Sequence, residues 1–242
     1  MDLQHAEAAV MRLSAPTPFQ IVSTHFRAQP LIDAGALHEV RALELLHRGL
    51  LPYEDPDAML EVDIRALESA ALLARECGCD WRIHCNVEIS SLLNSRWMDA
   101  MLGHMCPGVV VEIVERNGLL ADDRALHKVA LTVDGIRRFG GSIALDDVTG
   151  TPIEWEAIVA MQPEIIKVES TVRIDRLKGR SSSTLVIERI ETEDQARDAK
   201  EQGFDELQGY WCDVRAGAAV PIVLTPPGIA FFAELEAPRR AA

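Results

Sequence analysis

Acidic and amide side chains stand near the ends of five separate apolar runs of this chain. They are Glu44 in Arg-Ala-Leu-Glu-Leu-Leu, Asn86 in Ile-His-Cys-Asn, Glu112 in Val-Val-Val-Glu-Ile, Asp146 and Asp147 in Ile-Ala-Leu-Asp-Asp, and Glu188 in Leu-Val-Ile-Glu. An unpaired carboxylate in a buried strand is costly, because the charge loses its water. The repetition at successive strand ends therefore indicates one shared, oxygen-rich site, where a hard cation such as Mg²⁺ could offset the desolvation.

Strand-like and helix-like segments alternate along the chain, which predicts a mostly parallel sheet with helices outside it. The expected strands are 20–32, 38–47, 81–89, 108–114, 142–147, 164–169, 184–190 and 204–208. The expected helices are 56–76, 91–103, 121–138, 153–161 and 192–202. The length suits one α/β barrel, and no glycine-rich phosphate loop follows the first strand. We therefore prefer an α/β fold with a (β/α)₈ barrel to an open sheet.

Two regions are expected along the chain. Residues 1–18 have an apolar stripe at helical spacing, with Leu3 and Val10 on it, and end at Pro16 and Pro18, so they predict a short leading helix. Residues 19–242 form the barrel domain, and 216–242 are interpreted only as its closing segment.

Composition excludes some classes of protein. A net charge of -14 argues against a surface for nucleic-acid polymers or for anionic membranes. No apolar run is long enough for a membrane helix, and the polar start does not resemble a signal peptide. The five cysteines are an odd number in a chain of this size, which argues against a disulfide framework and favours a reduced, cytoplasmic setting. Cys77, Cys79 and Cys85 lack a second ligand pair for zinc and are interpreted as core residues.

The polar strand residues occur late on their strands, where a barrel keeps its active site. Glu44, Asn86, Glu112 and Asp146 can form a mixed carboxylate and amide shell, which suits Mg²⁺ or Mn²⁺ better than zinc. Asp147 could reach a second ion, and two ions can clamp the attacking and leaving oxygens of a phosphodiester.

Three further residues complete this chemistry. Lys167 can hold a water or neutralise phosphate charge, and Glu188 and Glu191 are the candidate general bases. For each acid the plainer alternative is a structural ion pair or a solvated strand end. His25, His47 and His84 match no motif and are interpreted as polar core or surface residues. Spacing alone thus predicts a metal-dependent barrel enzyme acting on an anionic substrate.

An ordered series of short motifs resembles the EAL-domain phosphodiesterases, which hydrolyse cyclic di-GMP to the linear dinucleotide. The resemblance spans about residues 19–215. Its motifs, in order, are Gln29-Pro30, Glu44-Leu45-Leu46-His47-Arg48, Asn86, Glu112-Ile113-Val114-Glu115, Leu145-Asp146-Asp147, Lys167-Val168-Glu169, Glu188-Arg189-Ile190-Glu191-Thr192 and Gln208-Gly209-Tyr210. The resemblance implies a modified TIM-like barrel whose first strand is antiparallel.

The resemblance also implies individual roles. Glu44, Asn86, Glu112 and Asp146 would bind one ion and Asp147 the other. Lys167 would orient water, Glu188 would be the base, and Glu191 and Gln208 would support the site. Gln29 and Arg48 would contact the nucleotide, and Glu115 would steady the loop after Asp147.

The chain departs from the family pattern in several places, including the Glu-Leu-Leu of the first motif and Glu169 in Lys167-Val168-Glu169, where an aspartate is usual. Val148-Thr149-Gly150-Thr151-Pro152 replaces the usual Phe-Gly-Thr-Gly after the two aspartates, and Arg189 stands where a glycine is usual. The segment between Lys167 and Glu188 is close to the minimum for a parallel crossover, so a shortened crossover is expected.

These departures leave three functions open. The first is a cytoplasmic phosphodiesterase for cyclic di-GMP. The second is a degenerate member that acts as a cyclic di-GMP receptor, and the third is a protein-interaction regulator with a protein partner. A metal-dependent enzyme for another anionic substrate is a more distant alternative. A homodimer is possible in each case.

Overall fold

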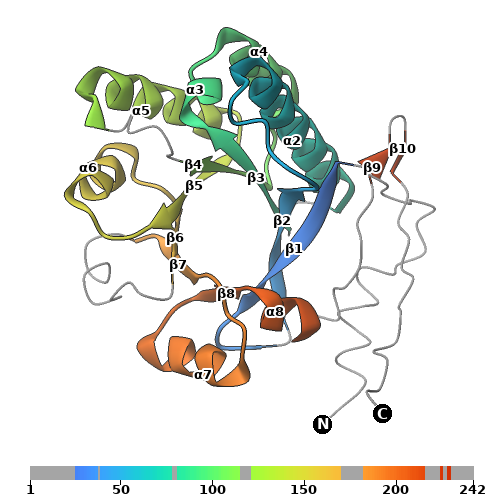
Figure 1. Ribbon diagram of the computed structural model, residues 1–242, viewed down its shortest axis with the longest axis vertical. Coiled ribbons are helices and arrows are strands. Elements are labelled where there is room, and N and C mark those ends of the chain that lie inside the picture. Colours follow the sequence, from blue (N-terminus) through green and yellow to red (C-terminus); the bar gives the residue numbers. More distant parts are fainter. Residues whose placement is uncertain are drawn as a thin grey trace.

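Eight strands close into a barrel in the order of the sequence, as the computed structural model shows (Figure 1). The structure describes residues 25–37, 39–77, 81–114, 121–169, 182–215, 224–225 and 228–229. The barrel strands are β1 (Phe26–Asp33), β2 (Val40–His47), β3 (Arg82–Glu88), β4 (Val109–Val114), β5 (Ser142–Val148), β6 (Ile165–Val168), β7 (Thr184–Ile187) and β8 (Glu206–Gln208). Strand β1 is antiparallel to both of its neighbours, and the other neighbouring pairs are parallel. The predicted fold class and its antiparallel first strand are confirmed.

Helices surround the barrel on the outside (Figure 1). They are α2 (Pro56–Cys77), α3 (Ile89–Leu92), α4 (Ser95–His104), α5 (Asp123–Arg138), α6 (Pro152–Met161), α7 (Glu193–Gln202) and α8 (Tyr210–Arg215). Two short strands, β9 (Leu224–Thr225) and β10 (Gly228–Ile229), pair with each other. No helix in the described ranges is both long and apolar enough to cross a lipid bilayer.

The strands are nearly continuous apolar runs because both of their faces are buried. Outward-facing residues such as Leu43, Ile83, Val111 and Ile143 pack against the helices in one large core. Inward-facing residues form a second, smaller cluster inside the barrel. Each strand therefore presents alternate residues to the helices and to the barrel interior.

The sequence and the structure differ at three elements. The expected helix 91–103 is two helices, because Asn94 accepts a hydrogen bond from the Arg96 backbone N–H and begins a new helix there. The expected strand 184–190 ends at Ile187, since Arg189 leaves the extended conformation. Helix α8 was not expected, because six residues are too few to show a helical period.

The shortened crossover lies between β6, which ends at Val168, and β7, which begins at Thr184 beside it. Residues 170–181 of this segment, the predicted leading helix 1–18, and most of 216–242 lie outside the described residues.

Candidate active site

Two layers of side chains fill the barrel interior. The lower layer contains six apolar residues from six different strands: Leu31, Ala42, Val110, Ala144, Ile165 and Val186. Strands β3 and β8 contribute polar residues to the same level, because His84 is in register with Val110 and Glu206 is in register with Val186. The lower layer therefore fills the barrel interior directly beneath the second layer.

The upper layer is polar on every strand. It lies two residues further along each parallel strand, at the carboxyl end, and two residues earlier on the antiparallel β1. Its members are Gln29, Glu44, Asn86, Glu112, Asp146, Lys167, Glu188 and Gln208. The carboxyl end of the strands is where barrel enzymes place their active sites. All eight residues were predicted as site residues, and the barrel brings them together.

Lys167 lies at the centre of this layer. Its Nζ is 2.8 Å from Glu112 Oε2, 2.9 Å from Glu44 Oε2, 3.0 Å from Glu188 Oε1 and 3.1 Å from Asp146 Oδ1. The Lys167 side chain is only 1% exposed. One buried ammonium thus faces four carboxylates, which together hold more negative charge than it can balance.

Amide side chains fix the carboxylates around Lys167. Asn86 Nδ2 donates to Glu44 Oε1 at 2.7 Å, and Gln208 Nε2 donates to Glu44 Oε2. Gln208 Nε2 also lies 3.1 Å from Gln29 Oε1, and Gln29 Nε2 donates to Asp213 Oδ2 on α8 at 3.2 Å. The network connects four strands and α8, so Glu44 is held from several sides.

The glycine after Gln208 permits this arrangement. Gly209 has a φ of 145°, and a Cβ there would collide with the backbone of Ile190. The Ile190 N–H donates to Gln208 O at 3.0 Å, and the Trp211 N–H donates to Ile190 O at 2.9 Å. The close crossing of these two segments needs a residue without a side chain.

The carboxyl groups of the upper layer differ in the direction of their pKa shifts. Burial would raise the pKa of Glu44, but the Lys167 ammonium and the hydrogen bonds from Gln208 and Asn86 lower it to about 2. Burial and the neighbouring Glu44 carboxylate raise the pKa of Glu112 well above its usual range. Burial also raises the pKa of Asp146, and raises that of Glu188 to about 7, despite the Lys167 charge. The layer therefore lacks positive charge, which a divalent cation could supply.

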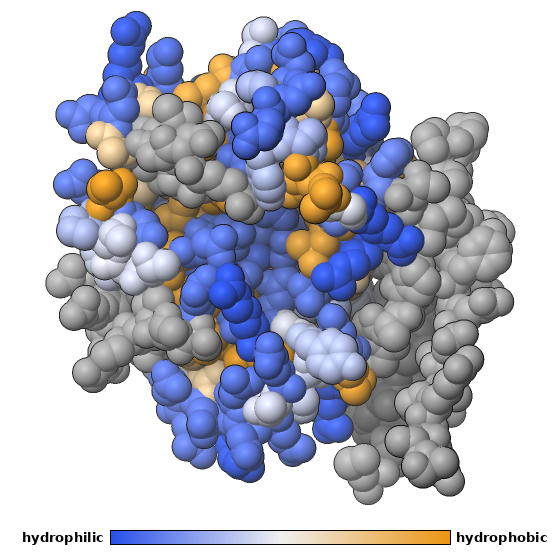
Figure 2. Space-filling model, in the orientation of Figure 1, coloured by the Kyte–Doolittle hydropathy of each residue, from blue (hydrophilic) through white to orange (hydrophobic). Residues whose placement is uncertain are grey.

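A cavity of about 560 Å³ opens above the layer. Strand ends and loops line it, including Arg27, Tyr53, Asp147, Glu191 and Tyr210. Hydrophilic residues gather in a hollow at the centre of this face (Figure 2). The volume falls in the range of small-molecule sites, and the acidic layer forms its floor.

The loop after Asp146 and Asp147 is built around Glu154. The Glu154 carboxylate accepts hydrogen bonds from the backbone N–H groups of Thr149 and Thr151 and from the Thr149 hydroxyl. Thr151 and Glu154 form a capping box at the start of α6. The pattern Thr-x-x-Glu is visible in the sequence and could have identified this support, which sequence analysis assigned only to Glu115. Glu115 itself lies outside the described residues.

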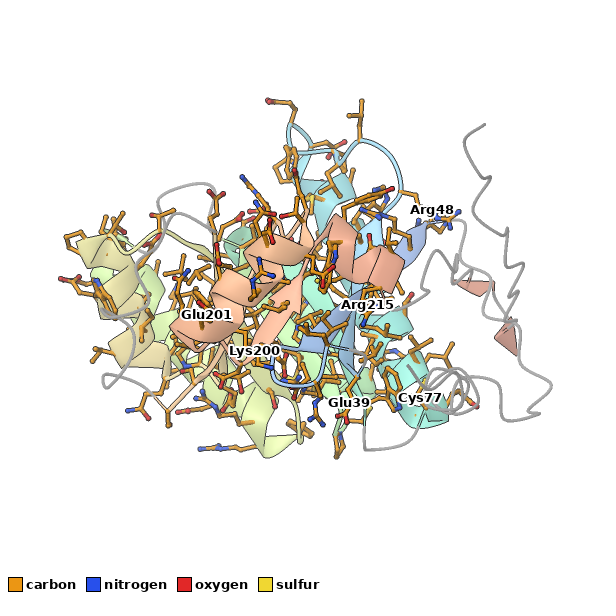
Figure 3. The ribbon with its side chains drawn as sticks, turned by 90° about the horizontal axis from the view of Figure 1, so that it is seen from below. Glu39, Arg48, Cys77, Lys200, Glu201 and Arg215 are labelled. Carbon is orange, nitrogen blue, oxygen red and sulfur yellow. The ribbon has the colours of Figure 1, made fainter. Side chains whose placement is uncertain are left out.

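Arg48 is the predicted site residue that the structure places apart from the cavity. It is exposed and does not line the cavity, and it lies at the outer edge of the barrel end (Figure 3). Strand β2 ends at His47, and the cavity is lined by His47 and Gly49 on either side of Arg48 but not by Arg48 itself. Arg27 and Arg189 are the arginines among the cavity residues. The nucleotide contact of Arg48 stays a prediction.

Two buried polar residues beside the site were not among the predicted site residues; His84 was interpreted only as a polar core or surface residue, and Asp63 was not singled out. Asp63 on α2 is 2% exposed and lines the cavity. His84 is fully buried, and its Nδ1 lies 2.5 Å from Glu112 Oε1. Strand parity could have found His84, because it stands two residues before Asn86 on the same face. Helical spacing could have found Asp63, four residues after the buried Met59.

Arg189 adopts a left-handed backbone conformation with a φ of 58°. That conformation costs a residue with a Cβ about 1–2 kcal/mol. Its side chain is 64% exposed and pairs with Glu169 Oε1 at 2.7 Å, and such an exposed ion pair contributes little. The strain is therefore stored next to Glu188, at the rim of the cavity.

We expect Arg189→Gly to raise the free energy of unfolding by about 1 kcal/mol, and the melting temperature by about 2–4 °C, by relieving this strain. Thermal unfolding followed by circular dichroism measures the change. Arg189→Ala is the matched control, because it removes the same ion pair but keeps the Cβ. Equal effects of glycine and alanine would show that the left-handed backbone is not the source of the change.

The donor set suits a hard divalent cation. Carboxylate and amide oxygens are the ligands that Mg²⁺ and Mn²⁺ prefer. Burial, and next the Glu44 carboxylate, raise the pKa of Glu112, and a bound cation would favour its ionised form. Within the described ranges, however, no three aspartate, glutamate, histidine or cysteine side chains are arranged around a common ion position. The carboxylates converge instead on the Lys167 ammonium, so metal binding would require these side chains to rearrange.

No protein-family model and no curated protein matches this sequence. Solved structures do match its fold. The Bacillus subtilis YkuI protein, with an EAL domain and in complex with substrate c-di-GMP and calcium, aligns over 77% of this chain and 53% of its own, with 20% identity and a TM-score of 0.62. The EAL domain of Mycobacterium smegmatis DcpA aligns over 78% of this chain and 90% of its own, with 20% identity and a TM-score of 0.62.

A third structure, Klebsiella pneumoniae BlrP1 with manganese and cyclic di-GMP, aligns over 81% of this chain and 55% of its own, with 20% identity and a TM-score of 0.60. The chain thus spans about half the length of the YkuI and BlrP1 chains. Its closed barrel with an antiparallel first strand is the fold of these EAL-domain structures.

Proposed function

We propose that this protein is a phosphodiesterase that hydrolyses one phosphodiester bond of cyclic di-GMP to give the linear dinucleotide, with Mg²⁺ or Mn²⁺ as cofactor. The observation that carries the proposal is the complete polar layer, from Gln29 to Gln208, at the floor of a cavity of about 560 Å³. YkuI and BlrP1, which share the fold, bind cyclic di-GMP together with calcium or manganese. These neighbours support the same ligand here.

Glu44, Asn86, Glu112 and Asp146 would hold one cation, and Asp147 would help to hold a second. A bound divalent cation would polarise the phosphodiester and lower the pKa of a bound water. Lys167, which contacts four carboxylates, would move toward the substrate phosphate or the water once the cation balances their charge.

Glu188 is the general base in this proposal. Its pKa of about 7 arises from burial, and it allows the carboxylate to accept a proton from water near neutral pH. Glu191 lines the same side of the cavity, and its backbone N–H is fixed by Gln195 in the capping box of α7. Arg27 and Arg189 at the cavity wall would face the phosphate that is not cleaved.

The decisive experiment incubates the purified protein with cyclic di-GMP and Mg²⁺ or Mn²⁺ and separates the linear product by chromatography. We expect Glu44→Gln to lower the rate at least about 1,000-fold, because a ligand of the cation is lost. Glu39→Gln is the matched control, since Glu39 is exposed at the other end of the barrel (Figure 3). Equal rates in the wild type and Glu44→Gln would show that hydrolysis does not take place at this site. If the wild type releases no linear product, the protein is not a phosphodiesterase for cyclic di-GMP.

A cyclic di-GMP receptor without turnover is the second candidate. The convergence of four carboxylates on Lys167, rather than on a common ion position, favours it. Calorimetry with cyclic di-GMP distinguishes the two candidates, because a receptor binds the nucleotide and releases no linear product. The homodimer, the protein partner and the cytoplasmic location stay predictions.

A further inference from the structure

His84 is a polar exception in the apolar lower layer of the barrel. Six of the eight strands place an aliphatic side chain at this level, whereas β3 places an imidazole that is 0% exposed. Burial of a polar ring is unfavourable unless its nitrogens find partners. A histidine here therefore needs a compensating contact, and the layer above provides it.

The contact is with Glu112, which is also 0% exposed. His84 Nδ1 lies 2.5 Å from Glu112 Oε1, and Lys167 Nζ lies 2.8 Å from the other oxygen, Oε2. The two carboxylate oxygens thus have different neighbours, one below the site and one within it. These two contacts, one to each oxygen, fix the rotation of the Glu112 carboxylate about the Cγ–Cδ bond.

The proton on the imidazole can be assigned from its surroundings. Nδ1 faces Glu112 Oε1, and a carboxylate oxygen can accept a hydrogen bond from an imidazole N–H. Nε2 is buried and has no hydrogen-bond partner among the described residues. The carboxylate contact at Nδ1 and the lack of a partner at Nε2 therefore place a proton on Nδ1, which donates it to Glu112.

We propose that His84 is a positioning residue for the cation site: its Nδ1–H holds Glu112 Oε1 below the layer, so that Oε2 points up toward the bound ion. The inference rests on the proposed function, in which Glu112 is a ligand. Hydrogen bonds to ligating side chains orient them, and their loss commonly lowers metal affinity about 10–100-fold.

Two substitutions separate the hydrogen bond from mere filling of space. Leucine at position 84 fills the volume but donates nothing to Glu112. Asparagine carries its N–H group on the atom that corresponds to Nδ1 and can still donate, whereas the longer glutamine side chain carries its N–H one bond further out. We therefore expect His84→Asn to retain the hydrogen bond to Glu112, and His84→Leu and His84→Gln to lose it.

The experiment measures Mn²⁺ affinity by electron paramagnetic resonance, with folding checked by circular dichroism. We expect His84→Leu to weaken Mn²⁺ binding about 10–100-fold and His84→Asn to restore most of it. Should His84→Leu not fold, the comparison of His84→Gln with His84→Asn decides the same question. Ile165→Val, in the same layer and without a polar contact, is the matched control and should leave the affinity unchanged.

The outcomes separate the inference from the proposed function. Mn²⁺ binding by the wild type with equal affinity in the leucine, glutamine and asparagine variants overturns the positioning role of His84 alone. Equal losses in all three variants also overturn it, because they would show a general packing effect. If the wild type binds no Mn²⁺, the cation site of the proposed function fails, and the role of His84 fails with it.

Discussion

Lys167→Met is expected to lower the free energy of unfolding by about 3–5 kcal/mol in metal-free buffer at neutral pH, because removing one partner of a buried charge cluster leaves the others uncompensated. The Lys167 Nζ lies within 3.1 Å of four carboxylates, and its side chain is 1% exposed. Methionine keeps a similar length and removes the charge. Denaturation in urea with a chelator present measures the loss.

A divalent cation should partly rescue this variant. Without the ammonium, Glu44, Glu112, Asp146 and Glu188 leave a pocket of negative charge that a cation can neutralise, and a ligand that binds only the folded state stabilises it. We therefore expect Mn²⁺ to raise the melting temperature of Lys167→Met more than that of the wild type. Hydrolysis should remain at least about 100-fold below the wild-type rate even with the ion present, because a positioned catalytic group is lost.

The control for this prediction is Lys128→Met on α5, where the lysine is exposed. Lys128→Met should change the free energy of unfolding by no more than about 0.5 kcal/mol. A Lys167→Met protein as stable as the wild type in chelator would contradict the prediction. It would mean that the carboxylates take up protons, or move apart, at little cost when the ammonium is absent.

The barrel and most of its polar layer were predictable from short-range periodicity, whereas the antiparallel first strand and the roles of Gln29 and Gln208 were implied only by the resemblance to EAL domains. A residue two positions before another on a strand shares its face, so polar residues at equivalent late positions must meet once the barrel closes. The same rule puts Lys167 on the face of Ile165, and Glu188 on the face of Val186. Alternation of strands and helices, punctuated by glycines, gave the positions of the elements to within a few residues.

What escaped prediction depends on exceptions to these rules. No propensity indicates that Arg189 would accept a left-handed conformation, where a glycine is expected. Arg48 follows the last residue of β2, and it lies outside the cavity although His47 and Gly49 on either side of it line the cavity. The contact of Lys167 with four acids depends on the distances across the barrel, which a strand pattern does not contain.

The second large effect concerns Asp63, whose ionisation should make the free energy of unfolding depend on pH. It lies on the buried face of α2, where Oδ2 accepts the Glu88 backbone N–H at 3.2 Å. Burial raises the pKa of Asp63 from 3.8 to about 7; the hydrogen bonds from Ser91 and Glu88 oppose this, and the Glu88 carboxylate adds to it. The carboxyl group is therefore protonated in the folded protein over a range where it is ionised in the unfolded chain.

The sign of the pH dependence follows from this difference. Between about pH 4 and pH 7 folding takes up a proton, so the free energy of unfolding falls as the pH rises through this window. Below the window the group contributes no penalty, and above it the full penalty of up to about 4 kcal/mol remains. Asparagine cannot ionise and keeps an oxygen that can accept the Glu88 N–H.

We therefore expect Asp63→Asn to match the wild type near pH 4 and to be about 2–4 kcal/mol more stable at pH 8. Urea denaturation at one-unit steps across this range, with a chelator present, measures the difference between the two proteins. Asp57→Asn, exposed in the first turn of the same helix, is the control and should show a constant difference. The difference between variant and wild type isolates Asp63 from the other buried acids, because those acids titrate in both proteins. A difference that stays flat from pH 5 to pH 8 would mean that Asp63 remains ionised in the fold, held by its hydrogen bonds despite its burial.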